Sequence, residues 1–241
     1  MKNLIFIPFL LWLLTGCRKD ETMNPNEPEL SPFIIENYSQ DARQLYFREI
    51  LADSTHPDHD NPVMDSLEID RILKIFQAVY NSRSPESNTV FNVYRIHVFS
   101  FFSFSSIMLE VDPGLPEIQN LSEGIIPTGE PALDQLLETW HFDSVSPSPW
   151  YPDYPWLTLV TCERYNMLPV AEAFRTLGVV TSANIVGYVI GDGNDITLTF
   201  DGNEALIVFS TGEGDCPSGC TEHTYREFSV RDGKARFIRT Y

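Results

Sequence analysis

Apolar residues recur every three or four positions in four stretches of the chain, and this spacing predicts four amphipathic helices. Each stretch begins with a residue that commonly caps a helix or occupies its first turn. The fourth helix is expected to close at Gly178, because glycine readily adopts the left-handed conformation found after many helices. The expected starts are, in chain order, Ser39, Asp65, Pro131 and Asn166.

Alternation of apolar and polar residues predicts strands in other parts of the chain. The segment 89–99 is apolar on both alternating faces, which predicts a central strand. Asp201-Gly202 and Asp232-Gly233 predict tight hairpins, because both residue types tolerate positive φ. Further strands are expected at 107–111, 156–161, 179–186, 195–200, 204–210, 223–230 and 234–240. We therefore expect an α+β fold: a mostly antiparallel sheet with a C-terminal meander and about four helices packed on one face.

The start of the chain has the pattern of a lipoprotein signal peptide. Lys2 precedes an uncharged run from Leu4 to Leu14, which is too short to span a bilayer as a helix. The run ends in Leu14-Thr15-Gly16-Cys17, which resembles the lipobox of bacterial lipoproteins. This resemblance implies cleavage before Cys17, acylation of that residue and anchorage in a membrane. An ordinary secretory signal followed by a chance cysteine is the alternative.

The residues after Cys17 add to this resemblance. Lys19-Asp20-Glu21 resembles the export signal of surface lipoproteins in Bacteroidota-type bacteria, which implies an outer-membrane lipoprotein at the cell surface rather than on the periplasmic face. The expected organisation is a signal peptide at 1–16, a lipidated tether at 17–32 and an α+β body at 33–241. The body is expected to divide into 33–111 and 156–241, which are joined by an acidic segment rich in proline and aromatic residues.

The net charge of the chain limits the kinds of partner that it can bind. The chain has 34 acidic and 16 basic side chains and a formal charge of −18, which argues against a nucleic-acid partner. Between Ile96 and Glu163 there are ten carboxylates and no lysine or arginine. This segment is a place to expect cations, basic partners or a solvated rim.

The segment His56-Pro57-Asp58-His59-Asp60 places two imidazoles and two carboxylates within five residues. Such side chains bind divalent transition metals, so His56, Asp58, His59 and Asp60 are candidate metal ligands. The competing interpretation is a polar loop that caps the following helix. No other cofactor is implied by a motif in the chain.

Three cysteines lie in the body of the chain. Cys216 and Cys220 are separated by a short Pro- and Gly-containing segment, and outside the cytoplasm such a pair favours a disulfide. Redox catalysis is the alternative, although redox pairs usually have only two intervening residues. Cys162 follows an apolar strand and is expected to be a small buried residue.

Further resemblances concern function. The blocks Ile69–Phe99 and Ile190–Val230, the second with Gly214-Asp215-Cys216-Pro217-Ser218-Gly219-Cys220, resemble uncharacterised envelope lipoproteins of Bacteroidota-type bacteria. The segment 156–186 is similar to the end of subtilisin-propeptide inhibitors, which lay a β-sheet against a protease. With no catalytic motif, we expect a non-catalytic binding or structural module with a protein or glycan partner at the envelope. The alternatives are a metal-dependent hydrolase using His56 and His59, and a propeptide-like protease inhibitor.

Overall fold

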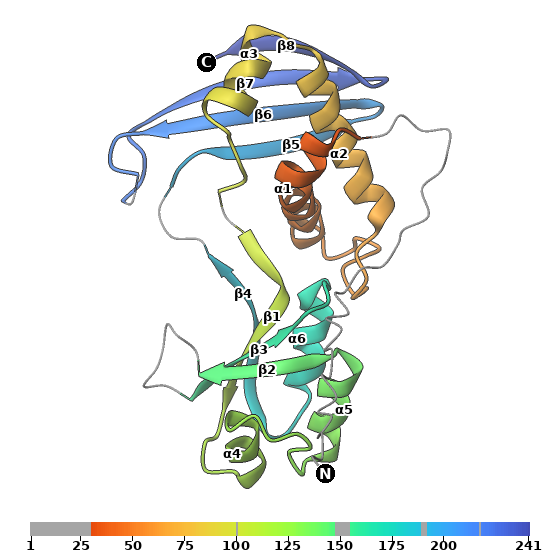
Figure 1. The fold of residues 1–241 in the computed structure, drawn as a ribbon, viewed down its shortest axis with the longest axis vertical. Coiled ribbons are helices and arrows are strands. Elements are labelled where there is room, and N and C mark those ends of the chain that lie inside the picture. Colours follow the sequence, from red (N-terminus) through yellow and green to blue (C-terminus); the bar gives the residue numbers. More distant parts are fainter. Residues whose placement is uncertain (1–29, 100, 148–154, 189–191, 217) are drawn as a thin grey trace, which may run out of the picture.

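The computed structural model of the chain describes residues 30–99, 101–147, 155–188, 192–216 and 218–241. The expected signal peptide, Cys17 and the tether up to residue 29 lie outside these residues, as does 148–154 of the aromatic and proline-rich stretch. The described part confirms an α+β fold, with six α-helices and two four-stranded antiparallel sheets (Figure 1). None of its helices is both long enough and apolar enough to cross a membrane.

The elements follow one another without long gaps. In chain order they are α1 (Pro32–Ala52), α2 (Ser66–Asn81), α3 (Pro85–Asn88), the π-helical turn η1 (Thr89–Val93), β1 (Phe101–Val111), α4 (Pro116–Ser122), α5 (Pro131–Thr139), β2 (Phe142–Pro147), β3 (Trp156–Thr161), α6 (Met167–Arg175), β4 (Val180–Tyr188), β5 (Asp195–Asp201), β6 (Glu204–Glu213), β7 (Glu222–Arg231) and β8 (Lys234–Thr240).

Residues 30–99 and 195–241 form what we call the terminal unit. Its strands make the antiparallel meander β5-β6-β7-β8 that the sequence predicts, and α1 and α2 cover one face of this sheet (Figure 1). The hairpin turns have positive φ at Gly202, Asp232 and Gly233, as their residue types favour. Aromatic rings fill the core between helices and sheet: Tyr38, Phe76, Phe91, Phe209 and Phe228 are all essentially buried.

Helix α1 begins earlier than expected. The side chain of Ser31 accepts a hydrogen bond from the Ile34 N–H, and Pro32 occupies the first helical position. Ile34 and Tyr38 are buried, so the first two turns pack in the core. The expected cap Ser39 lies inside the helix instead, where its hydroxyl donates to the Ile35 carbonyl. The starts expected at Asp65, Pro131 and Asn166 are confirmed.

Two local predictions are wrong. The segment 89–99 is not a central strand, because Ser84 caps and Pro85 begins a helix that continues into the π-helical turn. Phe91 is buried by this helical packing while Val93 is 63% exposed, so apolar residues on both alternating faces did not indicate a strand. Gly178 does not have positive φ, because α6 ends before it with a right-handed Thr176 as the cap.

Residues 101–188 form what we call the inserted unit. Its elements run strand, helices, strand, strand, helix, strand, and its sheet has the order β2-β3-β1-β4 with every neighbouring pair antiparallel. This is the split β-α-β arrangement. The inward residues of the strands, such as Leu109 and Leu159, pack against α4, α5 and α6 on one face of the sheet. The cores therefore divide the chain differently from the expected 33–111 and 156–241, because β1 pairs with β3 and β4 within one sheet.

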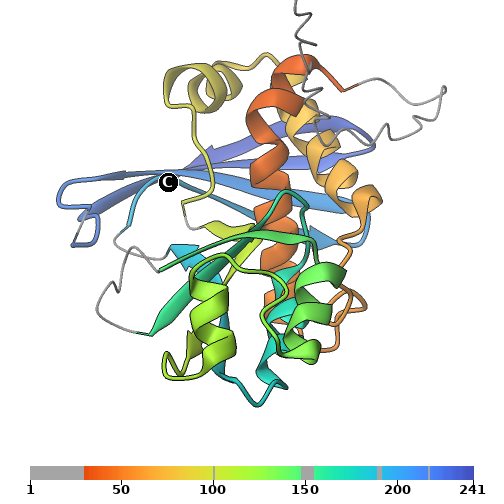
Figure 2. The same cartoon turned by 60° about the horizontal axis from the view of Figure 1, so that its bottom comes forward.

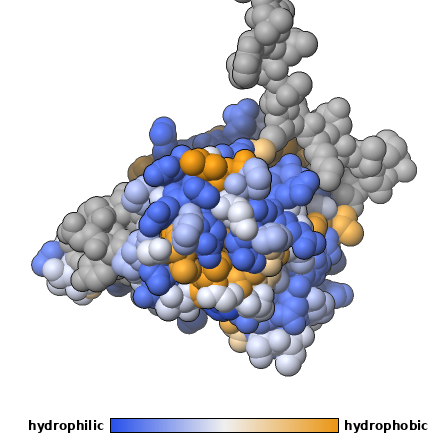
Figure 3. Space-filling model, turned by 90° about the horizontal axis from the view of Figure 1, so that it is seen from below, coloured by the Kyte–Doolittle hydropathy of each residue, from blue (hydrophilic) through white to orange (hydrophobic). Residues whose placement is uncertain are grey.

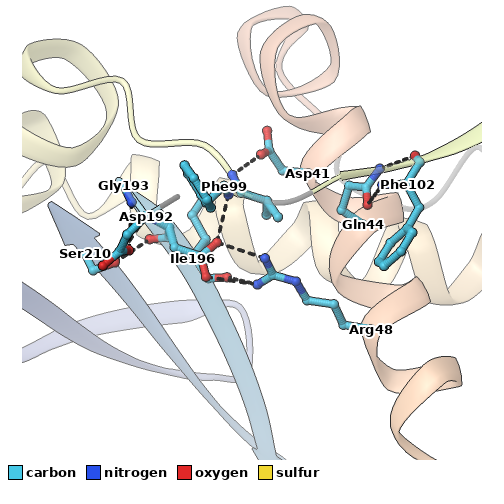
Figure 4. Close-up of polar contacts among 11 residues, drawn as sticks. Asp41, Gln44, Arg48, Phe99, Phe102, Asp192, Gly193, Ile196 and Ser210 are labelled. Carbon is cyan, nitrogen blue, oxygen red and sulfur yellow. Dashed lines mark hydrogen bonds and ion pairs between the residues drawn. The ribbon is translucent and has the colours of Figure 1, made fainter. Parts of the chain in front are cut away.

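Helix α1 belongs to the terminal unit and also extends toward the inserted unit (Figure 2). Three polar side chains on it, spaced by three and four residues, hold the segments that pass between the units (Figure 4). Asp41 accepts from the Val98 N–H at 2.6 Å, and Gln44 both donates to and accepts from the Phe102 backbone at 2.7 and 2.9 Å. Arg48 donates to the Asp195 carboxylate and to the Ile196 carbonyl. These contacts fix where the chain leaves the terminal unit and where it returns.

Candidate functional site

A pocket of about 640 Å³ lies in the inserted unit. We call it the acidic pocket; the loop at 126–127, helix α5, residues 141–143 and residues 162–163 line it. Figure 3 views the molecule from the end that carries α4 and α5, and apolar residues there are surrounded by hydrophilic ones. An apolar surface with a polar rim is typical of a binding surface.

The apolar part of the acidic pocket has a buried and an exposed component. Leu137 and Phe142 belong to the core of the inserted unit and are 1% and 5% exposed. Ile126 is 47% exposed and, with Pro127, forms one wall of the pocket. An aliphatic side chain left half in water at a pocket is available for contact with a ligand.

Asp134 holds this wall in place from α5. Its carboxylate accepts hydrogen bonds from the Thr128 N–H at 2.6 Å and the Gly129 N–H at 3.3 Å. Burial raises the pKa of Asp134, but these backbone hydrogen bonds outweigh it and hold the pKa below its ordinary value. Asn120 adds a bond from its amide to the Thr128 carbonyl at 2.8 Å. The loop is therefore positioned by two helices.

Four carboxylates contribute negative charge to the rim of the acidic pocket. Glu138, Asp143 and Glu163 are exposed and join Asp134 among the lining residues. No lysine or arginine is among the described residues that line it, in accordance with the absence of both between Ile96 and Glu163. The summed field of these carboxylates favours a cationic ligand.

His141 and Cys162 also line the pocket. His141 has a φ of 52° between α5 and β2, and its Nδ1 lies 3.3 Å from the Tyr165 hydroxyl. The expectation that Cys162 is buried is wrong: Cys162 is exposed. Its neighbour Thr161 takes the buried position at the end of β3, and strand alternation turns the next side chain outward.

The predicted metal ligands lie in the loop between α1 and α2, and none of them lines this pocket. His56 Nδ1 accepts from the Asp58 N–H at 3.0 Å, and His59 Nδ1 lies 2.8 Å from the Asp60 carboxylate. Among the described residues that could supply metal ligands, His56, Asp58, His59 and Asp60 do not form a group of three with closely spaced ligand atoms. A metal at this loop stays a prediction.

Hydrogen bonds explain the conformation of that loop. Asp58 accepts from the Tyr46 hydroxyl, from the Asn61 amide and from the Asp65 N–H. Burial raises the pKa of Asp58, but the three donors outweigh it and leave the pKa below its ordinary value. Asn166, fully buried at the start of α6, donates to the Asp58, His59 and Asn61 carbonyls. The loop thus docks the terminal unit on the inserted unit.

The predicted disulfide between Cys216 and Cys220 is confirmed. Asp192, Cys220 and His223 have candidate ligand atoms within 4.8 Å of one another, although the Cys220 sulfur is bonded to Cys216. The sequence did not reveal this group, because Asp192 and His223 belong to different segments that meet only through sheet pairing. The acidic pocket had one signal in the sequence, the long segment without lysine or arginine.

No family model, no curated protein and no solved structure matches the chain. Its own residues therefore carry the functional argument.

Proposed function

We propose that the chain is a lipid-anchored lipoprotein of the bacterial cell envelope, displayed at the outer-membrane surface, and that it acts as a non-catalytic binding module. Its acidic pocket binds a segment of a partner protein in which lysine or arginine lies beside an aliphatic or aromatic residue. The single observation that carries the binding function is the combination of an apolar wall at Ile126 with a rim of carboxylates and no cation.

The chemistry of the pocket favours a peptide with both properties. An aliphatic side chain placed against Ile126 and Pro127 removes apolar surface from water on both partners. A neighbouring ammonium or guanidinium then lies near Glu138, Asp143 and Glu163, which increases the association rate and selects against acidic segments. A neutral glycan gains little from such a rim, so a cationic protein segment is the preferred ligand.

Cys162 provides a direct test, because its exposed thiol lies at the pocket. The full chain, purified in detergent, is mixed with a peptide of alternating lysine and leucine, and the alkylation rate of Cys162 is measured by peptide mass spectrometry. We expect the peptide to slow alkylation and a matched peptide of alternating glutamate and leucine to leave the rate unchanged. Equal rates with both peptides would argue against binding at this pocket.

The membrane anchor is supported by Leu14-Thr15-Gly16-Cys17 and is tested separately. Growth of an expressing bacterium with a labelled fatty acid should label the chain, and Cys17→Ser should abolish the label. Changing Lys19-Asp20-Glu21 to three alanines should reduce digestion of the chain by protease added to intact cells. A Cys17→Ser chain that still carries the label would contradict the anchor.

A protease inhibitor is the second candidate, and one observation favours it. The helices of the inserted unit pack on one face of its sheet, and the other face presents half-buried residues such as Met108, Thr158 and Asn184, which are paired across three strands. A sheet face without a helical cover is what the similarity of 156–186 to propeptide inhibitors requires. Inhibition of a subtilisin by the full chain, with loss of inhibition on Met108→Asp, tests this candidate.

A further inference from the structure

A second group of reactive side chains lies at the disulfide loop, far in sequence from the acidic pocket. We call Asp192, Cys216, Cys220 and His223 the loop cluster. A carboxylate oxygen of Asp192, the Cys220 sulfur and a ring nitrogen of His223 lie within 4.8 Å of one another, and Cys216 is bonded to Cys220. The cluster thus contains two sulfurs, one imidazole and one carboxylate.

Asp192 is fixed against the disulfide loop by several hydrogen bonds. Its N–H donates to the Cys216 carbonyl at 2.9 Å, and its carboxylate accepts from the Cys220 N–H at 3.2 Å. The Gly193 N–H, at 2.7 Å, and the His223 ring contact the same carboxylate. These contacts orient the carboxylate toward the disulfide loop.

His223 contacts this carboxylate through one ring nitrogen only. Its Nε2 lies 2.8 Å from the Asp192 carboxylate, while Nδ1 is buried without a hydrogen-bond partner. The side chain is 22% exposed, so an ion from solution can reach the ring. Because Nδ1 is buried, Nε2 is the ring nitrogen that an ion at the loop cluster would contact.

The absence of a side chain at Gly212 lets the Cys220 sulfur lie close to the backbone of β6. A Cβ at this position would lie 2.2 Å from the Cys220 sulfur. Gly212 also pairs with His223 across β6 and β7, so the same backbone contact brings sulfur and imidazole together.

We propose that the loop cluster is a redox-dependent site for a divalent transition metal of the zinc type, formed by the Cys216 and Cys220 thiolates, the His223 imidazole and the Asp192 carboxylate. Two thiolates with an imidazole and a carboxylate supply four ligands of the kind that zinc takes in tetrahedral sites. The spacing, three residues between the cysteines and two before the histidine, places three ligands within eight consecutive residues, with His223 at the start of β7. The metal replaces the direct contact between His223 and Asp192.

The reaction balances with a dithiol reductant. Two electrons and two protons pass from the dithiol to the Cys216–Cys220 disulfide; the dithiol becomes a disulfide and the two cysteines become thiols. Binding of one divalent ion to the thiols then releases their two protons to solvent. Exchange with a disulfide oxidant reverses the sequence: the oxidant takes up two electrons and two protons and becomes a dithiol, Cys216–Cys220 forms again, and the ion is released. Disulfide and metal are therefore mutually exclusive states of one loop.

Cobalt tests the proposal, because thiolate ligands give it an intense near-ultraviolet charge-transfer absorption. The full chain, purified in detergent, is titrated with cobalt after reduction by a phosphine and, separately, in the oxidised form. We expect the absorption in the reduced chain only, with an affinity more than about 100-fold above that of the oxidised chain. His223→Gln should weaken binding and Cys162→Ser should not. Absence of the absorption in the reduced chain, or equal binding by His223→Gln, would overturn the proposal.

A second measurement needs no variant and so does not depend on how a variant folds. Zinc added to the reduced chain should slow alkylation of Cys216 and Cys220, while the rate at Cys162 stays the same, all read from one digest by mass spectrometry. Equal alkylation of all three cysteines with and without zinc would contradict the site.

Discussion

The guanidinium of Arg48 lies 3.0 Å from the Asp195 carboxylate, and this pair joins helix α1 to the first residue of the C-terminal sheet. Asp195 also accepts from the Phe99 N–H at 2.9 Å, so one carboxylate is bonded both to the helix and to the segment that enters the inserted unit. The pair therefore stabilises the junction between the two units.

Loss of Arg48 should destabilise the chain. Both side chains of the pair are 28% exposed, so Arg48→Met leaves a poorly solvated carboxylate. We expect the free energy of unfolding, measured by urea denaturation, to fall by about 2 kcal/mol. Arg231→Met is the control, because Arg231 is 63% exposed in its pair with Glu204 and should contribute about 0.5 kcal/mol. Equal losses in the two variants would contradict a special role for Arg48.

His97 should make stability depend on pH. Its ring lies 2.8 Å from the Asp41 carboxylate, and this hydrogen bond raises the pKa of His97 above its ordinary value. A raised pKa in the folded state means that the protonated ring stabilises the fold below the unfolded pKa of about 6.5. This contribution is lost as the pH rises through the higher pKa of the folded chain. It is modest, because the ring is 47% exposed.

Two measurements check this pH dependence. The titration of His97, followed by nuclear magnetic resonance, should have its midpoint above the ordinary histidine value, and Asp41→Asn should lower the midpoint. The difference in free energy of unfolding between the natural chain and His97→Gln should be larger at about pH 5.5 than at about pH 8.5. A difference in free energy of unfolding that increases with pH would contradict a raised pKa of His97 in the folded chain.

Asn166 should have two separable roles. Its side-chain oxygen caps α6 by accepting from the Leu168 N–H, and its amide donates to three carbonyls of the loop between α1 and α2. Asn166→Ala should lower the free energy of unfolding by about 3 kcal/mol, because a cap and the donors to three loop carbonyls are both lost. Asn166→Asp retains the cap but not the donors and should also destabilise strongly.

The control for Asn166 is Asp65→Ala, which removes only a cap, at the start of α2. It should lower the free energy of unfolding by about 1 kcal/mol. A stable Asn166→Asp chain would show that the cap, and not the docking of the loop, is what Asn166 contributes.

The sequence predicts the helices and hairpins whose ends depend on residues close by in the chain. The helix starts at Asp65, Pro131 and Asn166 and the hairpins at Gly202 and Gly233 depend on capping and turn chemistry within a few residues. The strand predicted at 89–99 is wrong because Pro85 begins a helix that continues into the π-helical turn. From this turn Phe91 contacts aromatic rings of α1, α2 and β6, which the alternation of apolar residues does not reveal.

Sites that combine distant segments of the chain are harder to predict from the sequence. The residue types of His56 to Asp60 indicate a metal site, but Tyr46, in the preceding helix, and Asn166, 108 residues after Asp58, hold that loop by hydrogen bonds. The pairing of Gly212 with His223, which assembles the loop cluster, depends on the register of β6 and β7. The charge of the acidic pocket and the pairing of Cys216 with Cys220 could be predicted, because each arises from one continuous segment.

The most direct test of the proposed function is the affinity of the acidic pocket for a cationic apolar peptide. The full chain in detergent is titrated by calorimetry with the peptide of alternating lysine and leucine. We expect saturable binding that Glu138→Gln/Glu163→Gln weakens by about tenfold. The matched control, Glu36→Gln/Asp201→Asn, removes two exposed carboxylates of the terminal unit and should leave the affinity unchanged. Equal affinity in both double variants would contradict binding at the acidic pocket.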